Sequence, residues 1–273
     1  MANGKIGTVL ASLLAACCAQ AASADEGTRV HREDDAIVYR GEILPEANAQ
    51  VRELLAGAIG IEWLRITSVG GEVRLGMDLG ELVREHGLNV KVVDYCASSC
   101  ANYVFPAGRR KLLPADSAVV WHGSAIQAGL GDLSTIDFSA VEEQRGHALS
   151  DDEKVELAEQ MGLTAYFDGV KRRQETFYAA IGVDPRVTVF GQDLDCRCNW
   201  TIPVADMARF GIAGVEAPDG YGSHLEPQGK RVVLLRLDDH PQYAASIDAA
   251  RAPAPAPGRR RSEQASRTLF PIE

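Results

Sequence analysis

Residues 63–100 read WLRITSVGGEVRLGMDLGELVREHGLNVKVVDYCASSC, and they carry the clearest secondary-structure pattern of the chain. Residues 63–68 form a short apolar run that predicts a strand, and Gly70-Gly71 ends it. A helix is predicted next, because an apolar face recurs at helical spacing and is formed by Leu75, Leu79, Leu82 and Val83. Gly87 follows as a C-terminal stop, and residues 89–94 predict the next strand. The stretch is therefore a strand–helix–strand unit.

Similar units lie on both sides of this stretch. Residues 36–40 alternate as a strand, and Pro45 opens an amphipathic helix. Residues 118–121 predict a fourth strand after the turn and short helix that follow Cys96. Because strands alternate with helices at this spacing, the sequence predicts an α/β fold with right-handed crossovers and buried, mostly parallel strands.

The second half of the chain is less regular. Residues 124–149 are polar and glycine-punctuated, which indicates an inserted loop or lid. Ser150-Asp151-Asp152-Glu153 is a capping box that predicts a helix reaching about residue 181. A late strand is predicted at 232–237. From 241 to 273 the chain loses periodicity and becomes Pro/Ala-rich and then basic, so we expect a disordered tail.

Length and charge bound the class of protein. The 273 residues fit one domain, expected over 30–240, better than two. The formal net charge of −10 disfavours nucleic acid as a partner, since phosphate backbones would be repelled. No stretch reaches the roughly 18–20 apolar residues that a membrane span needs.

The N-terminus has the pattern of an export signal. Lys5 precedes a short apolar run, and Ala22-Ser23-Ala24 suits a signal peptidase, so residues 1–24 are predicted to be removed. A second interpretation competes, because Leu14-Ala15-Ala16-Cys17 matches a lipobox in which Cys17 would carry lipid and tether the protein to a membrane. Both interpretations predict a periplasmic or otherwise extracytoplasmic protein.

The cysteines of the folded part agree with export. Four remain after the signal: Cys96, Cys100, Cys196 and Cys198. In an oxidising compartment these are most simply disulfides, although their connectivity cannot be deduced from spacing. Free thiols are a weaker alternative. A zinc site is another, because no histidine lies close in sequence to either cysteine pair. We expect no metal and no cofactor.

The order of the elements gathers chemical groups at one edge of the sheet. The C-terminal ends of parallel strands lie on one rim, which here would hold the Gly70-Gly71 turn, Ser99 at a helix start, and His122. Serine needs a neighbouring base to act as a nucleophile, and neutral histidine supplies one near pH 7. Main-chain N–H groups at a glycine turn and a helix start stabilise a developing oxyanion.

These motifs resemble the proteolytic subunit of the Clp protease and its relatives, in the crotonase superfamily. The matching motifs are Ser68-Val69-Gly70-Gly71, then Ala97-Ser98-Ser99-Cys100-Ala101, then Val120-Trp121-His122, with a closing element at residues 200–212. The Cys-Ala-Ser-x-Cys form and the N-terminal signal are similar to exported bacterial Clp-protease-like proteins. The resemblance covers roughly residues 35–215 and implies a spiral of ββα units.

The resemblance also implies roles for residues. Ser99 would be the nucleophile and His122 the general base, and the N–H groups of Gly71 and Cys100 would form the oxyanion hole. The family's aspartate falls on Asn199, with Asp195 or Asp193 close enough in sequence to substitute. Asparagine orients a histidine without stabilising its charged form. Ser98 is an alternative cap or nucleophile, and Val69 replaces the family's proline.

The function predicted from these features is an exported serine hydrolase that acts on peptides or proteins. One alternative is a catalytically impaired binding or scaffold protein of the periplasm that keeps the fold. A second is a crotonase-like acyl-transfer or hydratase enzyme, which export disfavours because CoA thioesters are cytosolic. By analogy with the family, the long helix predicted from Ser150 is expected to support homo-oligomerisation.

Overall fold

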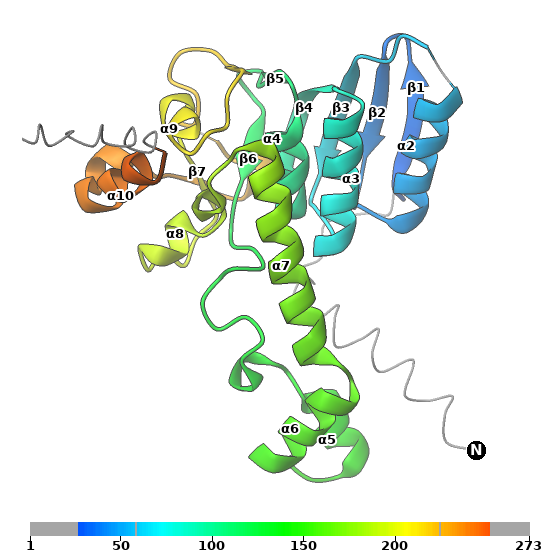
Figure 1. Ribbon diagram of the computed structural model, residues 1–273, viewed down its shortest axis with the longest axis vertical. Helices are drawn as coiled ribbons and strands as arrows, with labels where there is room; N and C mark the ends of the chain where they lie inside the picture. Colours follow the sequence, from blue (N-terminus) through cyan, green and yellow to red (C-terminus); the bar gives the residue numbers. More distant parts are fainter. Residues whose placement is uncertain (1–26, 58, 224, 252–273) are drawn as a thin grey trace, which may run out of the picture.

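The computed structural model describes residues 27–57, 59–223 and 225–251. The predicted signal at 1–24, Cys17 and the basic end at 252–273 lie outside these residues. The predicted fold class is confirmed, because helices alternate with a mostly parallel sheet (Figure 1). No helix in the described part of the chain is long and apolar enough to cross a membrane.

A seven-stranded sheet forms the centre of the fold. Its order is β1-β2-β3-β4-β5-β8, with β6 paired to β4. The strands are β1 (Arg29–Glu33), β2 (Ala36–Arg40), β3 (Trp63–Ser68), β4 (Asn89–Ala97), β5 (Lys111–Leu112), β6 (Ala118–Val120) and β8 (Val215–Glu216). Among these strand pairs, β1–β2 is antiparallel and the others are parallel. The sequence did not predict β1, since a single one of its residues is buried and no apolar alternation marks it.

Two helices lie against one face of the sheet, α2 (Pro45–Gly57) and α3 (Val73–Glu85) (Figure 1). Leu64, Ile66 and Val92 are fully buried, as the strand period of two requires for one face. Arg65 and Lys91 alternate with them and remain partly exposed. At these positions one face of the two strands is buried and the opposite face is partly exposed.

The predicted helix from Ser150 is two helices. Ser150 and Glu153 form the expected capping box, but α6 (Asp151–Gln160) ends before Gly162, which has φ +67°. The chain then turns into α7 (Leu163–Ile181). Residues 133–145 fold as η2 (Leu133–Thr135) and α5 (Ser139–Arg145), and α5 and α6 lie at the end of α7 that is far from the sheet (Figure 1). The predicted inserted loop is thus a small helical unit.

The remaining elements follow α7. They are η3 (Pro185–Thr188), α8 (Phe190–Asp193), β7 (Trp200–Thr201), α9 (Val204–Arg209), η4 (Pro227–Gly229), β9 (Val233–Leu234), η5 (Leu237–Asp239) and α10 (Pro241–Arg251). β7 and β9 form a separate parallel pair. The late strand is thus shorter than the predicted 232–237.

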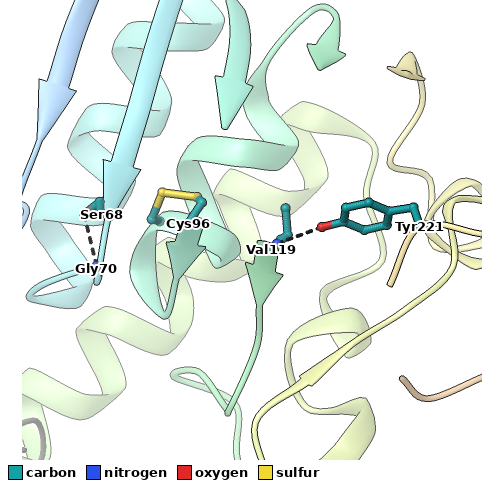
Figure 2. Close-up of a disulfide and its surroundings, with 6 residues drawn as sticks. Ser68, Gly70, Cys96, Val119 and Tyr221 are labelled. Atoms are coloured by element: carbon teal, nitrogen blue, oxygen red, sulfur yellow. Dashed lines mark hydrogen bonds between the residues drawn. A yellow bond between two sulfur atoms is a disulfide. The ribbon is translucent and has the colours of Figure 1, made fainter. Parts of the chain in front are cut away.

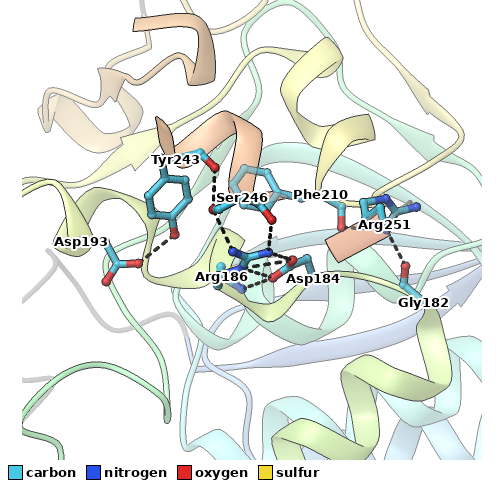
Figure 3. A network of polar contacts seen from close by, with 8 residues as sticks. All are labelled: Gly182, Asp184, Arg186, Asp193, Phe210, Tyr243, Ser246 and Arg251. Atoms are coloured by element: carbon cyan, nitrogen blue, oxygen red, sulfur yellow. Dashed lines mark hydrogen bonds and ion pairs between the residues drawn. The ribbon is translucent and has the colours of Figure 1, made fainter. Parts of the chain in front are cut away.

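The prediction of a disordered tail from residue 241 was wrong for its first part, because residues 241–251 form α10. Polar contacts hold this helix to the domain (Figure 3): Arg186 donates to Ser246 Oγ at 3.0 Å, and Arg251 donates to the Gly182 carbonyl at 3.1 Å. Ile247, a residue of this helix, is fully buried. A weak apolar period hid the helix from sequence reasoning, since its stability comes from these tertiary contacts.

Lys111 on β5 is a buried cation that supports a stability prediction. The residue is 4% exposed, its Nζ donates to the Ala213 carbonyl at 2.8 Å, and burial lowers the pKa of Lys111 to about 8. The charged form of Lys111 therefore destabilises the folded protein. This loss of folding free energy is complete below pH 8 and disappears as the pH rises towards 10.5.

We expect Lys111→Met to raise the free energy of unfolding by roughly 1–2 kcal/mol at pH 7. This value already includes the loss of the hydrogen bond to the Ala213 carbonyl. Denaturant melts at pH 7 and pH 10 measure it, and the gain should shrink at pH 10. A destabilised variant at pH 7 would contradict the assigned penalty.

Candidate functional site

The turn between β4 and the next helix carries the predicted nucleophile. Ser98 has φ +54°, a left-handed conformation that is uncommon for a residue with a side chain, and η1 (Cys100–Val104), a π-helix, starts after Ser99. β4 pairs with β6 at Ala97 and Val120, and the Ser98 N–H donates to the Val120 carbonyl at 3.1 Å. The serines thus lie beside the strand end that leads to His122.

The Gly70-Gly71 turn packs directly against this serine turn. Gly70 has φ +97°, and a Cβ there would lie 2.7 Å from the Ala97 carbonyl oxygen, so only glycine fits. Ser68 Oγ accepts the Gly70 N–H at 3.1 Å and closes the turn (Figure 2). The structure therefore brings the two predicted loops into contact.

Ser99 is buried, and its hydroxyl is already engaged. The residue is 2% exposed, and Oγ donates to the Gly71 carbonyl at 2.7 Å. Within the described residues no hydrogen bond joins Ser99 to His122. Ser98, by contrast, is partly exposed.

His122 lines a cavity of about 510 Å³. The walls are formed by Ala128, Gln192, Asp193, Asp195, Cys196, Arg197, Cys198 and Asn199 together with His122. The cavity therefore joins the predicted base to every residue that we considered as its acidic or amide partner. Ser99, Gly71 and Cys100 are not among the lining residues.

The backbone around His122 is held by two side-chain amides. Gln192 Nε2 donates to the His122 carbonyl at 3.1 Å, and Asn102 Nδ2 donates to the Gly123 carbonyl at 2.9 Å. Although His122 keeps exposed surface, desolvation by the surrounding protein lowers the pKa of its imidazole below the ordinary 6.5. The imidazole is therefore neutral near pH 7, as a general base requires.

The three candidates for orienting His122 differ in what they contact. The Asp193 carboxylate accepts the Tyr243 hydroxyl at 2.8 Å, which ties it to α10 (Figure 3). Asp195 has φ +56°, and the Asn199 carbonyl accepts the Val233 N–H at 2.9 Å. Asp193 is thus already partnered.

Sequence reasoning missed Gln192 and Tyr243 as residues of this region. Gln192 lies on the short helix α8, which has too few residues to show a period. Tyr243 lies in the segment that was assigned to the tail. Their roles follow from contacts between residues 50 or more positions apart, which no local pattern reveals.

The cysteines pair as local bridges. One disulfide joins Cys96 to Cys100 across the serine turn (Figure 2), and the other joins Cys196 to Cys198 in the cavity wall. The predicted disulfides are thus present in the structure. Within the described part of the chain, no group of three or more His, Cys, Asp or Glu side chains could hold a metal ion.

The solved structures that are similar to this chain include two of ClpP1. ClpP1 from Listeria monocytogenes has 17% identity and a TM-score of 0.36, over 68% of this chain and 92% of that one. A ClpP1 point mutant from the same organism has 18% identity and a TM-score of 0.31, over 47% and 88%. No family model matches the chain, and no curated protein does. The α/β class rests on the chain's own strand pairing.

Proposed function

We propose that this protein is an exported, Clp-protease-like serine hydrolase that cleaves peptides. Ser99 is the nucleophile, His122 is the general base, and the N–H groups of Gly71 and Cys100 bind the oxyanion. Asp195 or Asn199 orients the imidazole. The motif resemblance supplies these roles residue by residue.

One observation carries the proposal. The β4–β6 pairing and the contact of the glycine turn with the serine turn bring three loops to one rim of the sheet. A hydroxyl, an imidazole of lowered pKa and main-chain donors are the groups that acyl transfer from a peptide bond requires.

In this reaction the substrate carbonyl approaches the serine turn while Ser99 Oγ leaves the Gly71 carbonyl. His122 takes the hydroxyl proton as Oγ attacks the carbonyl carbon, and the main-chain donors hold the negative oxygen. His122 then returns the proton to the leaving amine, and water releases the acyl group by the same steps.

The proposal includes the location and the partners. The N-terminal pattern and two disulfides suit an oxidising, extracytoplasmic compartment. Lipidation of Cys17 would tether the protein to a membrane, and a homo-oligomer follows from the family resemblance. The substrate is a peptide or protein, and no cofactor takes part.

A catalytically impaired binding protein is the second candidate. It is favoured by the Ser99 hydroxyl, which is satisfied by Gly71, and by Asn199, which occupies the position of the family's aspartate. The two candidates differ in one measurable property, since only the hydrolase has a reactive serine.

The test is labelling of the full chain with a fluorophosphonate. After reduction and digestion by trypsin, we expect the adduct on Ser99, in the peptide that follows Lys91 and ends at Arg109. The labelling rate should fall as pH drops through the His122 pKa, with a midpoint below 6.5, because protonation removes the base. His122→Gln should lack this dependence. A folded protein that takes no label would favour the binding protein.

A further inference from the structure

The two disulfides differ in their access to solvent. Cys96 and Cys100 are both 0% exposed, inside the turn between β4 and η1. Cys196 and Cys198 are partly exposed and line the cavity that holds His122. A soluble thiol must reach a sulfur along the S–S axis to exchange with it, so the second bridge alone is open to attack in the folded protein.

The chain around the exposed bridge is anchored independently of it. The Cys196 N–H donates to the Gly191 carbonyl at 2.8 Å, and the Trp200 N–H donates to the Trp121 carbonyl at 2.9 Å. The Asn199 carbonyl accepts the Val233 N–H. Because these hydrogen bonds lie on both sides of the bridge, opening it rearranges only the turn at Arg197.

The bridge also adds little to stability. The bridged cysteines are two residues apart, and the stabilisation by a disulfide falls as the closed loop shortens. Arg197 lies between the two cysteines in sequence and lines the same cavity, and a cation near a sulfur favours the thiolate that leaves during exchange. Two carboxylates also line the cavity. Asp193 already accepts the Tyr243 hydroxyl, and the negative charge of Asp195 opposes the stabilisation of the thiolate.

We propose that Cys196–Cys198 is a redox-active disulfide that exchanges with dithiols, whereas Cys96–Cys100 is an inert structural bridge. A thiolate of the dithiol attacks one sulfur, the S–S bond breaks, and the other sulfur leaves with the electron pair and takes a proton. The second thiol of the dithiol, as its thiolate, then attacks the mixed disulfide and releases the remaining cysteine. Two electrons and two protons pass to the protein, and the dithiol leaves as a disulfide.

The redox state of this bridge acts on the cavity of His122. The turn that carries the bridge lies between Asp195 and Asn199, the two residues proposed to orient the imidazole. Opening the bridge therefore changes the wall that faces His122. The effect on hydrolysis rests on the proposed function, but the exchange itself does not.

The first test is timed reduction of the folded full chain by dithiothreitol, followed by alkylation and peptide mass spectrometry. Trypsin cuts after Arg197 and so separates Cys196 from Cys198, while Cys96 and Cys100 share a third peptide. We expect Cys196 and Cys198 to be alkylated roughly tenfold faster or more than Cys96 and Cys100. The same reaction in guanidinium is the control, where the difference should largely vanish. Equal rates in the folded protein, or faster reaction of Cys96–Cys100, would overturn the proposal.

The second test follows the imidazole of His122 by NMR titration, with His122→Gln to assign its signal. The His122 titration midpoint should differ between the oxidised and the selectively reduced protein, and Cys196→Ser/Cys198→Ser should reproduce the reduced value. Identical midpoints would refute coupling to the site. If selective reduction occurs but no redox state takes the fluorophosphonate label, the hydrolase proposal fails and the redox-active disulfide stands.

Discussion

Ser99→Ala is expected to lower the rate of fluorophosphonate labelling, and of peptide hydrolysis, by at least about a thousandfold. The reason is that the substitution removes the only atom proposed to form the covalent bond, and the remaining main-chain donors supply only residual catalysis. The rate of adduct formation, followed by intact mass, measures the effect. His122→Ala should lower it to a similar extent, because these two residues act as one unit.

The matched control is Ser98→Ala, one residue earlier in the same turn. Ser98 is partly exposed and makes no proposed bond to the substrate, so this variant should keep labelling within about tenfold of the wild type. If instead Ser98→Ala abolishes labelling and Ser99→Ala preserves it, the nucleophile is assigned to the wrong serine.

Folding must be measured beside activity in this series. Ser99→Ala removes the hydrogen bond to the Gly71 carbonyl and leaves that oxygen with one partner fewer, at a cost of about 1 kcal/mol. A thermal melt distinguishes this loss from unfolding. A thousandfold lower rate in a protein that still melts cooperatively assigns the effect to the missing hydroxyl.

The second large effect concerns Gly80 in α3. A Cβ at Gly80 would lie 2.5 Å from the Tyr103 carbonyl oxygen and 2.9 Å from Phe177 Cζ. The backbone of η1 would have to move, and overpacking of this kind costs more than the gain of about 1 kcal/mol in helix propensity from glycine to alanine. We expect Gly80→Ala to lower the free energy of unfolding by about 2–3 kcal/mol, which urea melts measure.

Gly169 in α7 provides the control with the opposite sign. Among the described residues, the atom that an added Cβ would meet within 4 Å is Arg74 Nη2 at 3.8 Å, an ordinary contact with a flexible side chain. Gly169→Ala should therefore stabilise the protein by about 0.5–1 kcal/mol through helix propensity. Stabilisation by both substitutions would contradict the close packing of α3 on η1.

Gly80→Ala also has a consequence for the site. The helix that it displaces, η1, starts directly after Ser99, and a Cβ added at Gly76 in α3 would lie 2.7 Å from the Ser99 Cβ. Helix α3 and the serine turn are therefore one packed unit.

Local sequence predicted much of the sheet. The apolar runs at 63–68 and 89–94 and the stop at Gly87 predicted β3, α3 and β4, because strand and helix periods express which side chains must leave water. The order of Gly70-Gly71, Ser99 and His122 predicted which loops share a rim, since parallel strands end on one edge. The structure brings the Gly70-Gly71 turn and the serine turn of that prediction into contact.

Tertiary structure alone decided the rest. The α10 helix has too weak a period to be predicted, and it exists because Arg186, Ser246 and Ile247 are held by distant residues. The orientation of the Ser99 hydroxyl towards Gly71, the partnering of Asp193 by Tyr243, and the different exposure of the two disulfides are likewise set by contacts far apart in sequence. A sequence pattern reports the average environment of a segment, whereas a single hydrogen bond depends on positions that only the complete packing fixes.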